Sequence, residues 1–164
     1  MTTQSAAWAP ALIAACMIVP QIVVAVMSPW VGRRAQTWGR RPLLLIATGA
    51  LVCRGILFAF VRDPHLLVVI QVLDGVAAAV LGVLVPLVIV DVTYGSGHFN
   101  LAQGVVGTAT GMGASVSVLF AGYFSDRFGN EVAFLSLAVS AAIALALVWL
   151  TMPETRPQLD RAQE

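Results

Sequence analysis

The chain has 164 residues, of which 59% are hydrophobic and 10% are charged, and nine arginines against eight carboxylates give a formal net charge of +1. Soluble domains carry about 25% charged residues, so a chain this poor in charge lacks the polar surface that water requires. The near-neutral balance also excludes the basic surface that nucleic acid would need, and the composition predicts an integral membrane protein.

Five apolar runs are long enough to cross a bilayer as helices. They cover residues 11–30, 43–61, 66–90, 102–124 and 132–152. At a rise of about 1.5 Å per residue, about twenty residues span the hydrocarbon layer. The sequence therefore predicts an all-α membrane protein with five transmembrane helices in a single domain, residues 1–164, that ends in a polar tail at residues 153–164. Neither cysteine has metal-ligand spacing, so we expect no metal and no cofactor.

The connection between the first two runs is the most basic segment of the chain. Residues 32–42 read Gly-Arg-Arg-Ala-Gln-Thr-Trp-Gly-Arg-Arg-Pro, with four arginines within nine residues. Cytoplasmic loops carry the excess of basic residues, so this loop should lie in the cytoplasm. Alternation of the spans then puts the N-terminus outside and the C-terminus inside, with six arginines on the cytoplasmic side and two outside.

Opposite charges lie inside the second and third runs. Arg54 stands ten residues before Pro64, and Asp74 stands ten residues after it, with Gln71 one turn earlier. Equal distances from a turn mean equal depth in an antiparallel hairpin, so we expect Arg54 and Asp74 to pair. Two interpretations stay open: an ion pair that only locks two helices, or a group beside a transport cavity that orients substrate or carries a coupling proton.

The third run ends at Asp91, where a carboxylate faces the negative end of the helix dipole and needs a cation. Alternation puts Asp91 on the same side of the membrane as Arg40 and Arg41. We therefore expect a charge network between Asp91 and the basic loop, with simple solvation of Asp91 as the alternative.

The fourth run is rich in small residues. Gly107, Gly111 and Ser115 are spaced four apart, which allows close contact with another helix in lipid. The Gly-x-Gly at residues 111 and 113 follows no strand, so a nucleotide site is not expected. Because the chain also lacks the common hydrolase motifs, we do not expect an enzyme.

The segment after the fourth run repeats the spacing of the basic loop. Its residues are Gly122, Asp126, Arg127 and Gly129, and its two glycines lie 90 residues after Gly32 and Gly39. Three spans separate the two copies, so they face opposite sides of the membrane. This is the pattern of inverted-topology repeats.

These motifs resemble the loop signature of the major facilitator superfamily of transporters, Gly-x-x-x-Asp-Arg-x-Gly-Arg-Arg. The matching positions are Gly32, Gly39, Arg40 and Arg41, while Gln36 and Thr37 replace the Asp and the first Arg. The Pro-Glu-Thr that begins at Pro153 is similar to the end of a half in that family. The resemblance implies a partial half-bundle that corresponds to spans eight to twelve of twelve, the C-terminal half of a truncated transporter.

The resemblance further implies a secondary active carrier, driven by a proton or ion gradient, that exports a small molecule or drug across the inner (plasma) membrane. Arg54, Asp74 and Gln71 would line or support the transport cavity, and the two loop motifs would hold the packing at the gates. Expected partners are the lipid bilayer, the substrate, and a missing N-terminal half, a second copy or another transporter. The alternative is a non-transporting fragment or accessory subunit that binds a full-length transporter.

Overall fold

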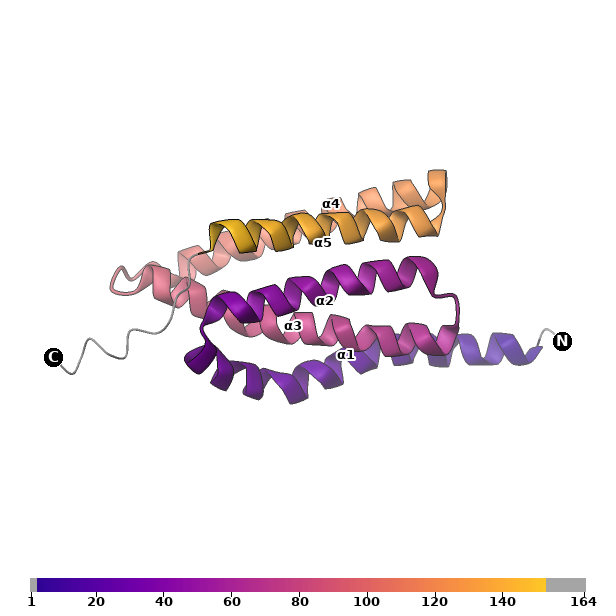
Figure 1. The fold of residues 1–164 in the computed structure, drawn as a ribbon, viewed down its shortest axis with the longest axis horizontal. Coiled ribbons are helices and arrows are strands. Elements are labelled where there is room, and N and C mark those ends of the chain that lie inside the picture. Colours follow the sequence, from indigo (N-terminus) through magenta and orange to yellow (C-terminus); the bar gives the residue numbers. More distant parts are fainter. Residues whose placement is uncertain (1–2, 153–164) are drawn as a thin grey trace.

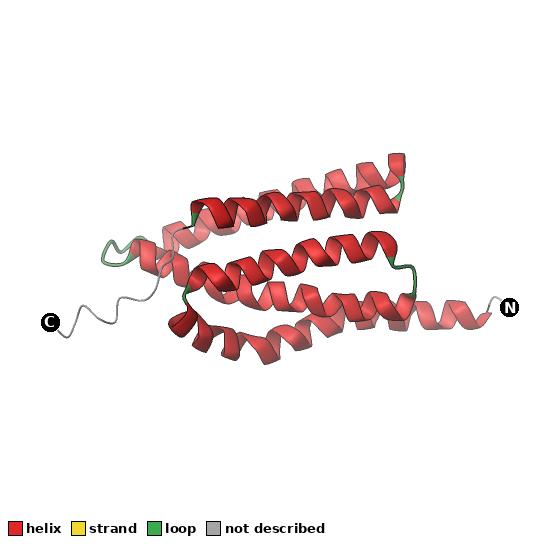
Figure 2. Ribbon diagram, viewed as in Figure 1, coloured by secondary structure: helices red, strands yellow, loops and turns green. Residues whose placement is uncertain are grey.

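The structure, a computed structural model, describes residues 3–152, and within them the chain folds into five helices joined by short connections (Figure 1). The helices are α1 Thr3–Trp38, α2 Arg40–Phe60, α3 Pro64–Thr93, α4 Phe99–Phe128 and α5 Asn130–Thr151. The described residues contain no strand (Figure 2). All five helices are long and apolar enough to cross a membrane, which confirms the predicted five-helix fold class. The expected polar tail and the motif at Pro153 lie outside the described residues.

The helices run beyond the apolar runs, so the basic segment is not the open loop that its composition predicts. α1 continues to Trp38 and α2 begins at Arg40, which leaves Gly39 as the only non-helical residue between them. Gly129 connects α4 to α5 in the same way. The backbone angles are φ 85° and ψ 175° at Gly39 and φ 89° and ψ 164° at Gly129, a region in which only glycine is unstrained. The two copies of the motif therefore share a backbone conformation as well as a spacing.

The main core lies among the first three helices. Its buried residues are Val31 and Ala35 of α1, Leu43 and Ala47 of α2, and Ala77, Val80 and Leu84 of α3. Close approach of α1 to α3 depends on Gly75, because a β-carbon there would lie 2.6 Å from Cβ of Val23 and 2.8 Å from the Pro20 carbonyl oxygen. Small residues thus bring these helices together without the hydrophobic effect that drives packing in water.

The fourth and fifth helices form a hairpin that joins the rest of the bundle mainly through α5 (Figure 1). α2 and α5 approach most closely at Gly55, where a β-carbon would lie 2.8 Å from Cβ of Ala138. α4 lies at the edge of the described bundle and has no buried residue. A β-carbon at Gly107 or Gly111 would meet nothing within 4 Å, and the Ser115 hydroxyl donates to a carbonyl of its own helix. The packing role of this stripe stays a prediction, since no described helix covers it.

Candidate functional site

The hairpin of α2 and α3 brings together the three charged and polar residues that the sequence places inside the membrane. Asp63 accepts a hydrogen bond from the His65 backbone N–H at 2.8 Å and begins α3, with Pro64 in its first turn. Proline fits there because the first helical N–H groups have no intrahelical partner. This tight turn fixes the register of the two helices, so residues at equal distance from it lie at equal depth.

Arg54 is the centre of the resulting cluster. Its Nη1 lies 3.2 Å from Oδ1 of Asp74, and its Nη2 donates to Oε1 of Gln71, also at 3.2 Å. The guanidinium carbon lies 5.2 Å from the centroid of the Phe58 ring, within the range of a cation–π contact. α3 thus supplies the hydrogen-bond acceptors, and α2 supplies both the arginine and the aromatic ring beneath it.

The cluster is partly accessible to solvent, and one of its hydrogen-bond donors has no partner in the described part of the chain. The side chains of Arg54 and Asp74 are 31% and 35% exposed, so each keeps an accessible edge. The Nε of Arg54 is buried and has no hydrogen-bond partner among the described residues. A guanidinium has five N–H donors, so the accessible edge of Arg54 retains capacity to bind a further hydrogen-bond acceptor.

Arg54 also lines a cavity of about 360 Å³ between α2 and α5. The other lining residues are Leu51, Gly55, Phe58, Phe134, Leu137, Ser140, Ala141 and Ala144. Gln71 and Asp74 hold Arg54 from α3 but are not among the residues that line this cavity. Of the three residues predicted to form or support a cavity, Arg54 therefore lines it, whereas Gln71 and Asp74 contact Arg54 without lining the cavity.

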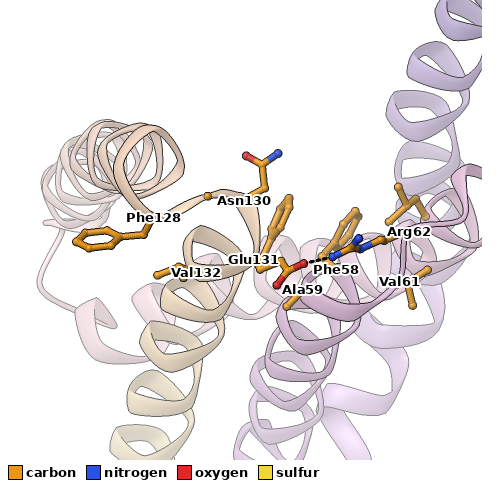
Figure 3. A pocket seen from close by; sticks show the side chains of 11 residues that line it. Phe58, Ala59, Val61, Arg62, Phe128, Asn130, Glu131 and Val132 are labelled. Atoms are coloured by element: carbon orange, nitrogen blue, oxygen red, sulfur yellow. Dashed lines mark hydrogen bonds and ion pairs between the residues drawn. The ribbon is translucent and has the colours of Figure 1, made fainter.

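A second cavity has a volume of about 540 Å³ and adjoins the first, because Phe58 and Phe134 line both. Figure 3 shows residues that line this second cavity. The rings of Phe58 and Phe134 stack with centroids 5.2 Å apart. At the mouth, Arg62 and Glu131 point toward each other and form an ion pair. The α5 residues of this site were not predicted, because nothing in the sequence indicates which helix packs on α2. The one feature of the sequence that points to this contact is the opposite charge of Arg62 and Glu131, which stand at the ends of two spans on the same side of the membrane.

The basic motif ties together the other end of the bundle. Arg40, whose side chain is 12% exposed, forms an ion pair with Asp91 at 2.5 Å, so α2 is tied to the end of α3 as the helix dipole favours. Arg41 does not join this pair. Its Nη2 donates to the Trp149 carbonyl oxygen at 2.8 Å, in the last turn of α5, where carbonyl groups lack intrahelical partners.

The remaining motif residues make fewer contacts. Gly39 is buried, whereas Gly32 and Gly122 have open space where a β-carbon would be. Asp126 and Arg127 are exposed at the end of α4, and neither forms an ion pair with a described residue. The second copy of the motif thus keeps the connecting glycine but not the charge contacts of the first.

The contacts at the two ends of the α2–α5 pair are related by the 90-residue repeat. Arg41, at the start of α2, forms a hydrogen bond near the end of α5, and Arg62, just after α2, forms an ion pair near the start of α5, so the two helices run antiparallel. Residue 131 is 90 positions after Arg41, the same shift that relates the connecting glycines. The contacts at both ends therefore fit a pseudo-twofold axis through the α2–α5 contact, as inverted repeats require.

Comparison with known proteins agrees with this architecture. The family model described as Major Facilitator Superfamily matches residues 1–164. Two Mycobacterium tuberculosis proteins, from strains CDC 1551 / Oshkosh and ATCC 25618 / H37Rv and each named an uncharacterized MFS-type transporter, are 42% identical over 145 residues, which is 88% of this chain and 35% of each relative.

A more distant relative is named Citrate exporter 1, from Yarrowia lipolytica; it is 22% identical over 133 residues, covering 81% of this chain and 20% of that protein. No solved structure matches the chain significantly. The chain spans about a third of the length of the two mycobacterial relatives. Five membrane-length helices, the paired loop motifs and the full-length family match together establish that the chain belongs to the major facilitator superfamily.

Proposed function

We propose that this chain is the C-terminal half-bundle of a secondary active transporter that exports a small molecule across the inner (plasma) membrane, with its N-terminus outside and its C-terminus in the cytoplasm. The observation that carries the proposal is the cluster of Arg54, Asp74 and Gln71 beside a cavity. A charged residue inside the membrane costs about 2.5–3.5 kcal/mol on insertion scales, and such residues mark substrate and ion pathways.

The chemistry of the cluster favours an anionic or acceptor-rich substrate. Arg54 lines the cavity and keeps an accessible edge, while Asp74 and Gln71 hold it from α3. An anionic substrate would take the place of Asp74 on the guanidinium, and Asp74 would form the ion pair again once the substrate has left. The distant relative named as a citrate exporter supports export and an organic anion.

We also propose that a further helix covers α4. Alternating access moves one bundle against another, and α4 has no buried residue among those described. On α1, close packing against α3 involves Pro20 and Val23. The positions 90 residues later are Thr110 and Gly113 on α4, so we expect the covering helix to contact α4 there. The covering helix would come from an N-terminal part of the transporter, a second copy or another transporter.

The exposed α4 also favours a second function, in which the chain is an accessory subunit that binds a full-length transporter and moves no substrate itself. Reconstitution separates the two functions. The purified chain is placed in proteoliposomes with an imposed proton gradient, and uptake of citrate and of lipophilic cations is measured. Gradient-dependent flux that Asp74→Asn abolishes, but that Arg33→Gln leaves intact, would support transport through the Arg54 cluster, because Arg33 is exposed and lines neither cavity.

A folded, reconstituted chain without flux would refute self-sufficient transport. Co-purification from native membranes with a full-length transporter, lost when Gly113→Leu blocks the exposed face of α4, would then support the accessory function. Co-purification that Gly113→Leu leaves unchanged would contradict the proposed covering of α4. Gly113 is a suitable position because a side chain there meets open space within the chain.

A further inference from the structure

The last two turns of α1 carry an arginine between two tryptophans. Trp30, Arg34 and Trp38 are spaced four residues apart, so they follow one another along the helix surface. The guanidinium carbon of Arg34 lies 5.6 Å from the ring centroid of Trp30 and 4.7 Å from that of Trp38. The two indoles meet edge to face with centroids 6.1 Å apart. Both distances from Arg34 are those of cation–π contacts.

This arrangement holds Arg34 in place without using its hydrogen-bonding edge. Stacking occupies the face of a guanidinium, whereas its N–H donors point outward in the plane and match a phosphate group. Neither Arg34 nor the exposed Arg33 forms an ion pair with a carboxylate among the described residues. The donors of both arginines are therefore available to an anion.

The two ends of the bundle also differ in charge. Among the described residues, the end that contains Arg34 carries four arginines against Asp91, which is already paired with Arg40. The opposite end carries two arginines against three carboxylates: Arg62 and Arg127 against Asp63, Asp126 and Glu131. An excess of arginine beside a membrane span attracts anionic lipid.

The surface beside Arg34 has the character of a lipid contact. Trp30 and Trp38 are 39% and 44% exposed, as expected of aromatic anchors at the membrane interface. One and two turns toward the membrane centre, Val26 and Ile22 continue the four-residue spacing and are 71% and 58% exposed. A cationic group at the interface is thus followed by an apolar track, which complements a phosphate headgroup followed by an acyl chain.

We propose that Arg33, Trp30, Arg34 and Trp38 form a binding site for the headgroup of an anionic phospholipid, with one acyl chain along Val26 and Ile22. The site does not depend on transport by the chain. The phosphate accepts hydrogen bonds from both arginines, and the two indoles fix the guanidinium of Arg34 at headgroup depth. A net negative headgroup is favoured over a zwitterionic one because the excess arginine charge is not neutralised by the described residues.

Native mass spectrometry of the whole purified chain tests the proposal, with phosphatidylglycerol and phosphatidylcholine of the same acyl chains as probes. The native chain should retain phosphatidylglycerol preferentially. Arg33→Gln/Arg34→Gln should weaken that binding about thirtyfold, since each juxtamembrane arginine contributes roughly fivefold. The matched control, Arg62→Gln/Arg127→Gln, removes two arginines from the opposite end and should change the affinity by less than about twofold. Circular dichroism verifies that all variants are folded.

Arg34→Lys separates a built site from general attraction by charge. Lysine keeps the charge but loses the planar stack and the paired donors, so we expect roughly twofold weaker binding, a smaller loss than the neutral glutamine causes. Binding of Arg34→Lys equal to that of the native chain, or an equal loss in the control, would overturn the proposal. So would displacement of the lipid by inorganic phosphate alone, or a photo-crosslinker at position 38 that captures a protein instead of a lipid in native membranes.

Discussion

Gly55→Ala tests the packing of α2 against α5 most directly. A β-carbon at position 55 would lie 2.8 Å from Cβ and 2.9 Å from Cα of Ala138. Carbon atoms in contact prefer about 3.5–4.0 Å, so the two helices would have to separate by about 1 Å. Overpacking typically costs about 1–3 kcal/mol, whereas alanine in place of glycine favours a helix by about 0.8–1.0 kcal/mol. We expect the free energy of unfolding to fall by about 1 kcal/mol.

Gly49→Ala is the matched control, because it lies in the same helix and a β-carbon there meets nothing within 4 Å. This variant should gain up to about 1 kcal/mol from helix propensity alone. The measurement is the free energy of unfolding in mixed micelles, from denaturing-detergent titration followed by circular dichroism. Gly55→Ala/Ala138→Gly should recover only part of the loss, because the backbone of residue 138 stays in the way. Equal stabilisation by Gly55→Ala and Gly49→Ala would refute close packing of α2 on α5.

Three further predictions use the same unfolding measurement. Asp74→Asn should lower the free energy of unfolding by about 2 kcal/mol, between the values for exposed and buried ion pairs. Arg54→Gln/Asp74→Asn should lower it by less, because no uncompensated charge remains. Losses from the two single substitutions that add up strictly in the double variant would contradict the pairing. Asp91→Asn should lower the free energy of unfolding by about 1–2 kcal/mol, because it leaves the nearly buried Arg40 without its partner. An unchanged free energy would show that Asp91 is merely solvated. Gly129→Ala should cost about 1–3 kcal/mol because of its positive φ, and a neutral result would mean that the connection relaxes.

Local patterns in the sequence were sufficient for much of the fold. Length and hydropathy gave five helices, because each span must satisfy its own backbone hydrogen bonds in lipid. The position of Pro64 was enough to pair Arg54 with Asp74, since a tight turn makes sequence distance equivalent to depth. Asp91 and the basic motif were paired by the same alternation, although the structure selects Arg40 as the partner and directs Arg41 to α5.

Contacts between distant helices could not be predicted in this way. Nothing in the local sequence of Gly55 points to Ala138, because lipid-facing and helix-facing residues are both apolar in a membrane protein. The cavity residues on α5, including Phe134, were missed for this reason. The helical state of the basic segment was missed as well, since composition predicts a loop wherever charge is dense, and only the conformation of Gly39 shows that one residue suffices for the turn.

The position of the core within the chain sets an order for biosynthesis. Every residue of the main buried cluster belongs to α1, α2 or α3, and Leu84 is the last of them. Once α3 has left the ribosome and entered the bilayer, the chain therefore already contains a three-helix unit with its interior filled, before α5 has joined it. α4 packs mainly against α5, and α5 must then bind to a surface of α2 that is already assembled. Ribosome-bound intermediates from which α3 has just emerged should accordingly resist proteolysis within the membrane.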